Sequence, residues 1–227
     1  MENIKNSISQ WWEQNSPTDF DAANPQVRLH DPTFGPDEIS AVVEQMLSTH
    51  VTMGPVVKAF ERSFCDTLGY KYGVSNNSGS SANLLMISAL TNPVTENYIK
   101  PGDEVILPSL TWSTSLWPLT PRGLVPVFVD SCPKTLNILP SAIEAAITPR
   151  TRVIMAVPVY GNPCDMDAIM DICERHNLTL IEDCCESMGA TYDWKAVGSF
   201  GRVASFSFYY SHHITTIEGG ICLTTDH

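Results

Sequence analysis

Three short segments carry residues whose types and spacing could do chemistry. The first is Asn77-Ser78-Gly79-Ser80-Ser81, which follows a short apolar stretch and opens a helical pattern. A Gly/Ser turn at a helix N-terminus presents free backbone N–H groups and the positive end of the helix dipole, which suits a phosphate group. Serine is also an ordinary helix N-cap, so the turn alone is equally compatible with a structural role.

The second segment is Ile181-Glu182-Asp183, which ends an apolar, strand-like run. A buried carboxylate needs a partner. A protonated ring nitrogen is one such partner, because the ion pair keeps both groups charged. The alternative is a structural Asp183 that caps the following loop.

The third segment runs from Ser207 to Gly220, where a strand-like run gives way to Ser, His, Thr and Gly residues. Ser207 could donate a hydrogen bond to a phosphate. A single histidine at such a place is more often structural than catalytic. The adjacent His212 and His213, close to a Glu-Gly-Gly turn, favour a functional role without deciding it.

These segments need a scaffold, and hydropathy patterning indicates which one. Apolar strand-like runs alternate with helical stretches at 78–90, 140–147 and 165–175. The pattern predicts an α/β fold with a mostly parallel, buried sheet, in which ligands sit at the carboxyl ends of the strands. The predicted strands are 105–108, 125–130, 153–159, 178–183, 203–208 and 221–225.

Two further helices precede the sheet. Pro36 with Asp37 and Glu38 is typical of a helix start, and a second helix carries apolar residues from Val57 to Leu68. Residues 1–30 are polar and are expected to form an N-terminal arm, with 31–227 as one large domain. The chain stops just after a strand, so we expect it to be truncated at its C-terminus.

Composition excludes several classes of function. The 227 residues carry a net charge of −12, which argues against a nucleic-acid or anionic-membrane surface. No apolar run suggests a signal peptide or a membrane span. The seven cysteines show no C-x-x-C spacing, so we expect reduced thiols in a cytoplasmic protein, with no metal site.

Taken in order, the three segments resemble the fold-type-I PLP-dependent enzymes, and more narrowly the DegT/DnrJ/EryC1/StrS sugar aminotransferase family. The resemblance covers about residues 28–227. It implies the PLP/PMP-binding large domain, with helices on both faces of the sheet, and a C-terminal small domain that is missing here. Further motifs that carry it are Thr52-Met53-Gly54, Pro101-Gly102-Asp103-Glu104-Val105, Val129-Asp130, Tyr160-Gly161-Asn162-Pro163, Gly198-Ser199-Phe200-Gly201 and Thr215-Thr216.

The resemblance implies a role for each matching residue. Gly79 and Ser80 contact the cofactor phosphate, with Ser207 as a second phosphate donor. Asp183 pairs with the pyridine nitrogen and so makes the ring an electron sink. Trp112 takes the place of the aromatic residue that stacks on the ring, although it could also be a plain core tryptophan.

One position departs from the aminotransferase pattern. Where those enzymes keep the lysine that holds the cofactor covalently, this chain has His212, and Lys195 lies in a polar turn that makes it no substitute. The imidazole cannot hold the cofactor covalently, but it can move a proton, since its ordinary pKa is about 6.5. His212-His213-Ile214 and Glu186 are similar to the 3-dehydratase branch that acts on GDP-4-keto-6-deoxy-D-mannose. In that branch, the acid at the position of Glu186 lies against the ring hydroxyl of the cofactor.

The resemblance to this branch implies a non-covalent PLP/PMP enzyme of dideoxysugar and lipopolysaccharide O-antigen biosynthesis. The expected partners are a nucleotide-linked keto-sugar, L-glutamate as amino donor and a second copy of the chain in a homodimer. His212, five residues after Ser207, is the expected acid–base, and His213 is expected to point away on an extended segment. The alternatives are a sugar aminotransferase and an inactive cofactor-binding relative. A related branch carries an iron–sulfur cluster, whose cysteines would lie beyond residue 227.

Overall fold

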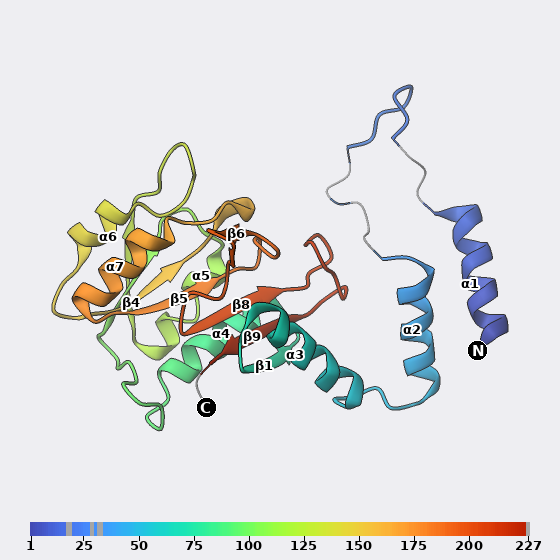
Figure 1. Cartoon of the computed structure of the whole chain (residues 1–227), viewed down its shortest axis with the longest axis horizontal. Helices are drawn as coiled ribbons and strands as arrows, with labels where there is room; N and C mark the ends of the chain where they lie inside the picture. The colour runs from blue at the N-terminus through green and yellow to red at the C-terminus, as the bar shows by residue number, and fades with distance from the viewer. Residues whose placement is uncertain (17–19, 28–29, 31–33, 226–227) are drawn as a thin grey trace.

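A seven-stranded sheet organises the chain (Figure 1). The computed structural model describes residues 1–16, 20–27, 30 and 34–225. The strands lie in the order β1-β9-β8-β5-β4-β2-β3. Their bounds are β1 Tyr72–Asn76, β2 Glu104–Pro108, β3 Val125–Val129, β4 Thr151–Ala156, β5 Thr179–Asp183, β8 Val203–Ser207 and β9 Gly220–Thr224.

The five strands from β3 to β8 are parallel, β9 runs antiparallel to them, and β1, which pairs antiparallel with β9, runs in the same direction as the five. The predicted mostly parallel sheet is therefore confirmed. The run predicted as a strand over 153–159 ends earlier, at Ala156. Pro158 offers no backbone N–H to a ladder, and a short 3₁₀ turn, Val159–Gly161, follows it.

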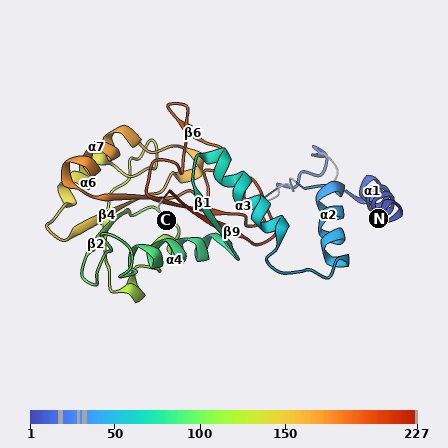
Figure 2. The same ribbon diagram turned by 60° about the horizontal axis from the view of Figure 1, so that its bottom comes forward.

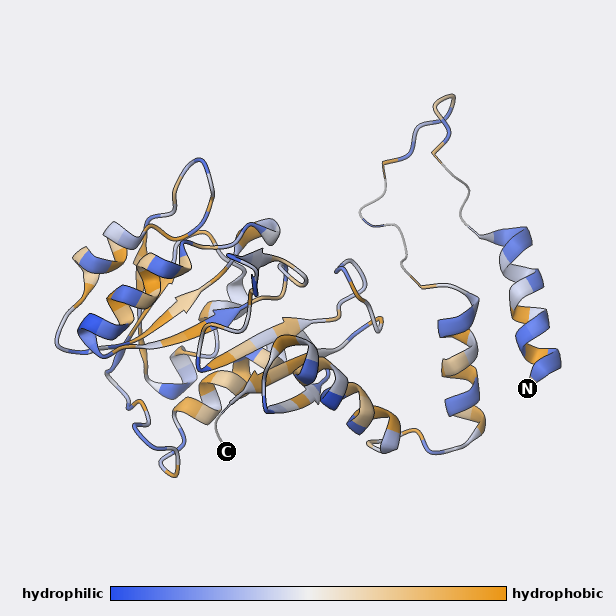
Figure 3. Cartoon of the chain, viewed as in Figure 1, coloured by the Kyte–Doolittle hydropathy of each residue, from blue (hydrophilic) through white to orange (hydrophobic). Residues whose placement is uncertain are grey.

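Helices cover both faces of the sheet (Figure 2). Helix α4 (Gly79–Leu90) lies on one face, and α6 (Pro140–Ala146) and α7 (Met166–His176) lie on the other. Successive strand residues point to opposite faces, so Val105 and Leu107 pack with α4 while Ile106 packs with α6 and α7. Figure 3 shows the apolar residues running along these central strands.

Loops at the carboxyl ends of the parallel strands carry the predicted site residues. Helix α5 (Ser113–Leu116) follows β2, and the loop 184–190 follows β5. A small hairpin of β6 (Thr191–Tyr192) and β7 (Lys195–Ala196) comes next. A short 3₁₀ helix, Thr120–Arg122, leads into β3.

The N-terminal part forms helices α1 (Glu2–Asn15), α2 (Pro36–Leu47) and α3 (Pro55–Leu68). The helices α2 and α3 confirm the two predicted from sequence. Helix α3 lies against β1, whereas α1 and α2 pack on each other away from the sheet (Figure 1).

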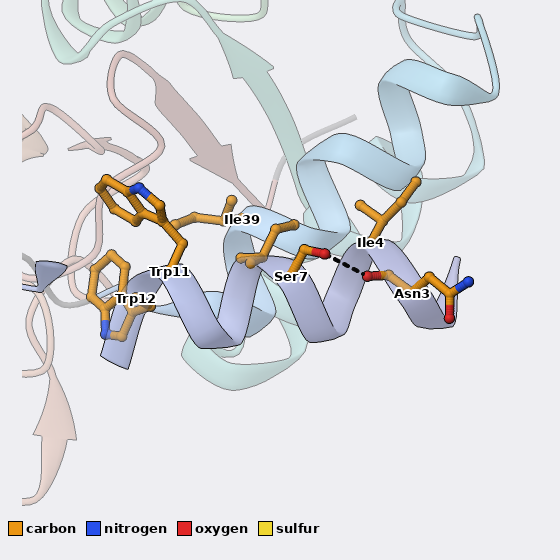
Figure 4. A pocket seen from close by; sticks show the side chains of 7 residues that line it. Asn3, Ile4, Ser7, Trp11, Trp12 and Ile39 are labelled. Atoms are coloured by element: carbon orange, nitrogen blue, oxygen red, sulfur yellow. Dashed lines mark hydrogen bonds between the residues drawn. The ribbon is translucent and has the colours of Figure 1, made fainter. Parts of the chain in front are cut away.

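The predicted N-terminal arm contains a helix, α1, that the sequence analysis did not anticipate. Apolar side chains recur along α1 at helical spacing and meet Ile39 of α2 in a shallow pocket (Figure 4). The expected domain boundary between residues 30 and 31 falls at the segment 31–33, which lies outside the described residues. Over the described ranges, the helices are too short or too polar to cross a bilayer.

Candidate cofactor site

The site begins where one turn of α4 meets the end of β8. Gly79 and Asn83 are four residues apart on the helix, a rise of about 6 Å. Ser205 and Ser207 are two apart on the strand, about 6.6 Å, and face the same side. A Cβ added to Gly79 would lie 2.5 Å from the Cβ of Ser207, so only glycine allows this approach. Asn83 in turn accepts a hydrogen bond from Ser205 Oγ at 2.5 Å.

Hydrogen-bond donors converge at the N-terminus of α4. Ser78 caps the helix, and its Oγ accepts from the amide of Ser81 at 3.1 Å. The amides of Gly79 and Ser80 donate to no acceptor in the part of the chain that the structure describes. The hydroxyl of Ser207 is buried beside them and accepts only a 3.3 Å bond, from the amide of Tyr209. Together these donors form a seat for an anion such as a phosphate.

Asp183 ends β5 and is only 4% exposed. Its Oδ2 accepts from Asn83 Nδ2 and from Ser115 Oγ, both at 2.7 Å, and its Oδ1 accepts from the amide of Cys185 at 3.3 Å. Within the described ranges, no Lys, Arg or His lies within ion-pair distance of this carboxylate. A buried carboxylate held only by neutral donors fits a cationic ligand group, and a protonated pyridine nitrogen is of that kind.

Asn83, Ser115 and Ser205 are site residues that the sequence analysis missed. Asn83 had a signal, since it is a polar residue at the helical spacing of Met86, Ile87 and Leu90, which otherwise form an apolar helix face. Ser115 and Ser205 had none, because a serine near a helix start or within a strand is common.

Glu182, next to Asp183, faces the other side of the sheet. Its carboxylate accepts hydrogen bonds from the amides of Gly198, Phe200 and Gly201 at 2.6–2.8 Å. Burial raises the pKa of Glu182, and the three amides oppose that shift. Glu182 therefore fixes the 198–201 loop and lies apart from the anion seat.

His212 lies in a turn after β8, with its amide donating to the carbonyl of Tyr209 at 3.0 Å. The ring is partly buried, and its centroid is 6.0 Å from that of Tyr209. The expectation of an extended segment here is wrong, because the backbone turns at 210–214. His213 is nevertheless the more exposed of the two histidines.

The charges around His212 are mixed. Burial is the largest effect and lowers the pKa of His212. The nearby carboxylates of Glu186 and Asp183 raise this pKa, whereas His213 and His30 lower it further. The imidazole is therefore held in its neutral form, which can accept a proton. Glu186 itself is exposed, on the loop after β5.

Trp112 lies in the loop after β2 and is 70% exposed. The alternative of a plain core tryptophan is therefore wrong, and its stacking role stays a prediction. The Trp112 carbonyl accepts from the amide of Ser115, which brings this loop to Asp183. Lys195 lies in the β6–β7 hairpin, with Nζ 4.2 Å from the ring centroid of Phe200.

Metal-binding side chains are not grouped in the part of the chain that the structure describes. There, no three His, Cys, Asp or Glu residues gather to hold an ion. All seven cysteines are free thiols.

Known proteins share both the sequence pattern and the fold. A GDP-4-keto-6-deoxy-D-mannose 3-dehydratase from Yersinia pseudotuberculosis is 44% identical over 198 residues, covering 87% of this chain and 50% of the relative. The solved structure of an E. coli GDP-4-keto-6-deoxy-D-mannose 3-dehydratase with bound hydrated PLP is 43% identical with a TM-score of 0.85, covering 88% of this chain and 51% of that one. An aminotransferase from Psychrobacter cryohalolentis is 37% identical with a TM-score of 0.80, covering 86% and 48%.

The chain thus spans about half the length of the relatives it matches. The similarity confirms the fold-type-I large-domain architecture expected from the sequence. The model of the DegT/DnrJ/EryC1/StrS aminotransferase family matches residues 32–227, most of the chain. This chain belongs to the DegT/DnrJ/EryC1/StrS aminotransferase family.

Proposed function

We propose that the full-length protein is a PMP-dependent 3-dehydratase of a nucleotide-linked 4-keto-6-deoxyhexose, in dideoxysugar and lipopolysaccharide O-antigen biosynthesis. The observation that carries this proposal is the presence of His212 where the aminotransferases of the family keep lysine. The names of the similar proteins support the substrate class, and GDP-4-keto-6-deoxy-D-mannose is the first substrate to test.

The residues present fit the cofactor. Gly79, Ser80 and Ser207 would hold its phosphate, because their free amides and hydroxyl converge at the α4 N-terminus. Asp183 would hold the ring nitrogen protonated, since this buried carboxylate otherwise lacks a cationic partner among the described residues. Trp112 is proposed to stack on the ring, and Glu186 to face its hydroxyl group.

Bound PMP would supply an amine that reacts with the C4 ketone of the sugar and a ring that accepts electron density. His212 would remove a proton at the C4′ carbon of the cofactor and return a proton to the leaving C3 oxygen. The neutral imidazole can accept the first proton, and the imidazolium so formed can donate it to the oxygen.

The second candidate function is sugar amine transfer, favoured by the 37% identity to an aminotransferase. Amine transfer in this family relies on the covalent lysine. The chain has no lysine after Lys195, whose ammonium group lies over Phe200. A third candidate, an inactive relative, has no need of the buried Asp183 and its hydrogen-bond partners.

One assay separates these candidates. The full-length protein is incubated with PMP and GDP-4-keto-6-deoxy-D-mannose, and ammonia and sugar products are measured. A dehydratase releases ammonia and a 3-deoxy-4-keto sugar. Formation of an amino sugar would overturn the proposal in favour of amine transfer. Bound PMP with neither product would indicate a different sugar nucleotide or an inactive relative, and other 4-keto-sugar nucleotides would distinguish the two.

The first prediction is that the cofactor is bound without a covalent link. Borohydride treatment of the PLP-loaded protein, followed by intact mass measurement, should show the unmodified polypeptide, because His212 cannot form a reducible link. A phosphopyridoxyl adduct on any lysine would contradict the assignment of His212 to the lysine position.

The second prediction concerns pH. Burial lowers the pKa of His212 below its ordinary value of 6.5, so the basic form persists at lower pH and the acid limb of kcat/KM should lie below 6.5. The Glu186 carboxylate stabilises the imidazolium and raises this pKa, so Glu186→Gln should move the limb to lower pH. An upward shift in the variant would contradict the assigned interaction.

We also propose that L-glutamate is the amino donor and that the full-length protein is a cytoplasmic homodimer. The free state of all seven cysteines supports a reducing compartment. Exposed apolar residues on α1 and α2, among them Trp11, Val42 and Met46, support an interface. A fully active protein that sediments as a monomer would overturn the proposed dimer.

A further inference from the structure

The carboxylate of Asp183 receives its two short hydrogen bonds on one oxygen. Asn83 Nδ2 and Ser115 Oγ both donate to Oδ2 at 2.7 Å. Oδ1 receives the longer 3.3 Å bond from the amide of Cys185. Asn83 and Ser115 are both fully buried, so no solvent competes for these bonds.

The direction of each bond follows from donor and acceptor chemistry. An ionised Asp183 only accepts, so Asn83 must turn its NH₂ group toward it and its carbonyl away. That carbonyl then accepts from the hydroxyl of Ser205, at 2.5 Å. Ser115 has one hydroxyl proton, which it gives to Asp183, so the 2.7 Å bond with Thr111 must have Thr111 as donor.

Two polarised chains therefore converge on the same oxygen, one from Ser205 through Asn83 and one from Thr111 through Ser115. Because both donors are themselves held by a further hydrogen bond, they fix the orientation of the Asp183 carboxylate. They also occupy Oδ2, which leaves Oδ1 as the oxygen with capacity for a further donor.

We infer that Asn83 is a positioning residue that holds the Asp183 carboxylate by Oδ2 and presents its Oδ1 to the ring nitrogen of the cofactor, with Ser115 as a second donor. The inference rests on the role of Asp183 in the proposed function. It extends that role to a residue on α4, one helical turn after the anion seat at Gly79. The same turn of helix thus places the phosphate end and the ring end of one ligand.

The test reads the protonation of the ring directly. Full-length protein loaded with PMP, ¹⁵N-labelled at the ring nitrogen, is followed by NMR from neutral to alkaline pH. We expect Asn83→Leu to lower the pKa of the bound ring nitrogen by about one unit or more and kcat by about tenfold to one-hundredfold, the size of a lost hydrogen bond to a charged group. Asn83→Gln, which keeps the amide, and Ser115→Ala should give smaller shifts in the same direction.

Neighbouring titratable groups do not obscure this reading. Cys184, Cys185 and His212 all interact electrostatically with Asp183. Burial raises the pKa of both thiols well above the usual range, so they stay neutral, and the lowered pKa of His212 keeps the imidazole neutral as well.

Asn137→Leu is the matched control. Asn137 is also buried and makes three hydrogen bonds, to Val159, Asn162 and Pro163, away from Asp183. It should lose stability as Asn83→Leu does, yet leave the ring nitrogen unchanged. If Asn83→Leu does not fold, Ser115→Ala carries the test.

The outcomes separate the inference from the proposed function. A ring nitrogen whose pKa is unchanged in both Asn83→Leu and Ser115→Ala would overturn the inference and leave Asp183 in its role. A ring nitrogen that is unprotonated in the wild type would overturn the role of Asp183 itself.

Discussion

Replacing His212 by Asn is expected to lower the turnover of the full-length protein by about 10²- to 10⁴-fold, the usual cost of losing general acid–base help. Asn keeps a polar side chain of similar length but cannot accept the proton. Because the phosphate seat and Asp183 lie on other elements, PMP should remain bound. Steady-state turnover and a PMP titration of the same preparation measure both effects.

His213→Asn is the matched control for that variant. His213 neighbours His212 in the same turn, but it is more exposed, so its replacement should keep most of the activity. The turn at 210–214 means that this distinction rests on burial and on the five-residue spacing from Ser207. Equal loss in the two variants, or a dead His213→Asn enzyme, would show that the register after Ser207 is wrong.

Replacing Asp183 by Asn should separate catalysis from folding. The amide oxygen can take the place of Oδ2 and accept from Asn83 and Ser115 as the carboxylate does. The negative charge is lost, so the ring nitrogen is no longer held protonated and turnover should fall by about 10²- to 10³-fold, as when a preorganised electrostatic partner is removed.

The thermal unfolding midpoint of Asp183→Asn should stay the same or rise, because the variant removes a buried charge that has no protein counter-ion among the described residues. Unfolding followed by circular dichroism, beside turnover of the same preparation, measures both quantities. Unchanged turnover would count against the electron-sink role. A large drop in the midpoint would instead assign Asp183 a mainly structural role.

Much of the fold follows from local pattern. Runs such as Val105–Pro108 and Val153–Ala156 are apolar because parallel strands are buried on both faces, and that composition is visible along the chain. Helix starts such as Pro36 with Glu38 are also local, since Glu38 bonds the amide of Gly35 only three residues away. Helix α1 was missed because its few apolar residues are diluted by polar ones and lie in a segment rich in Asn and Gln.

The sequence by itself determined the residue types at the ends of the strands: Ser78-Gly79-Ser80, Asp183, Ser207 and His212 stand in motif order, and that order alone indicates the family. Only the tertiary structure decided which residues complete the site. Asp183 meets Asn83 across 100 residues and Ser115 across 68, and Asn83 meets Ser205 across 122. Such contacts depend on how α4 lies across β8 and β9, which brings Asn83 to the end of β5, and no local spacing encodes the packing of a helix on a sheet. The turn that carries His212 also depends on long-range packing. Ser207 and Gly220 are paired in the β8–β9 ladder, so the chain between them must leave the sheet and turn back to it.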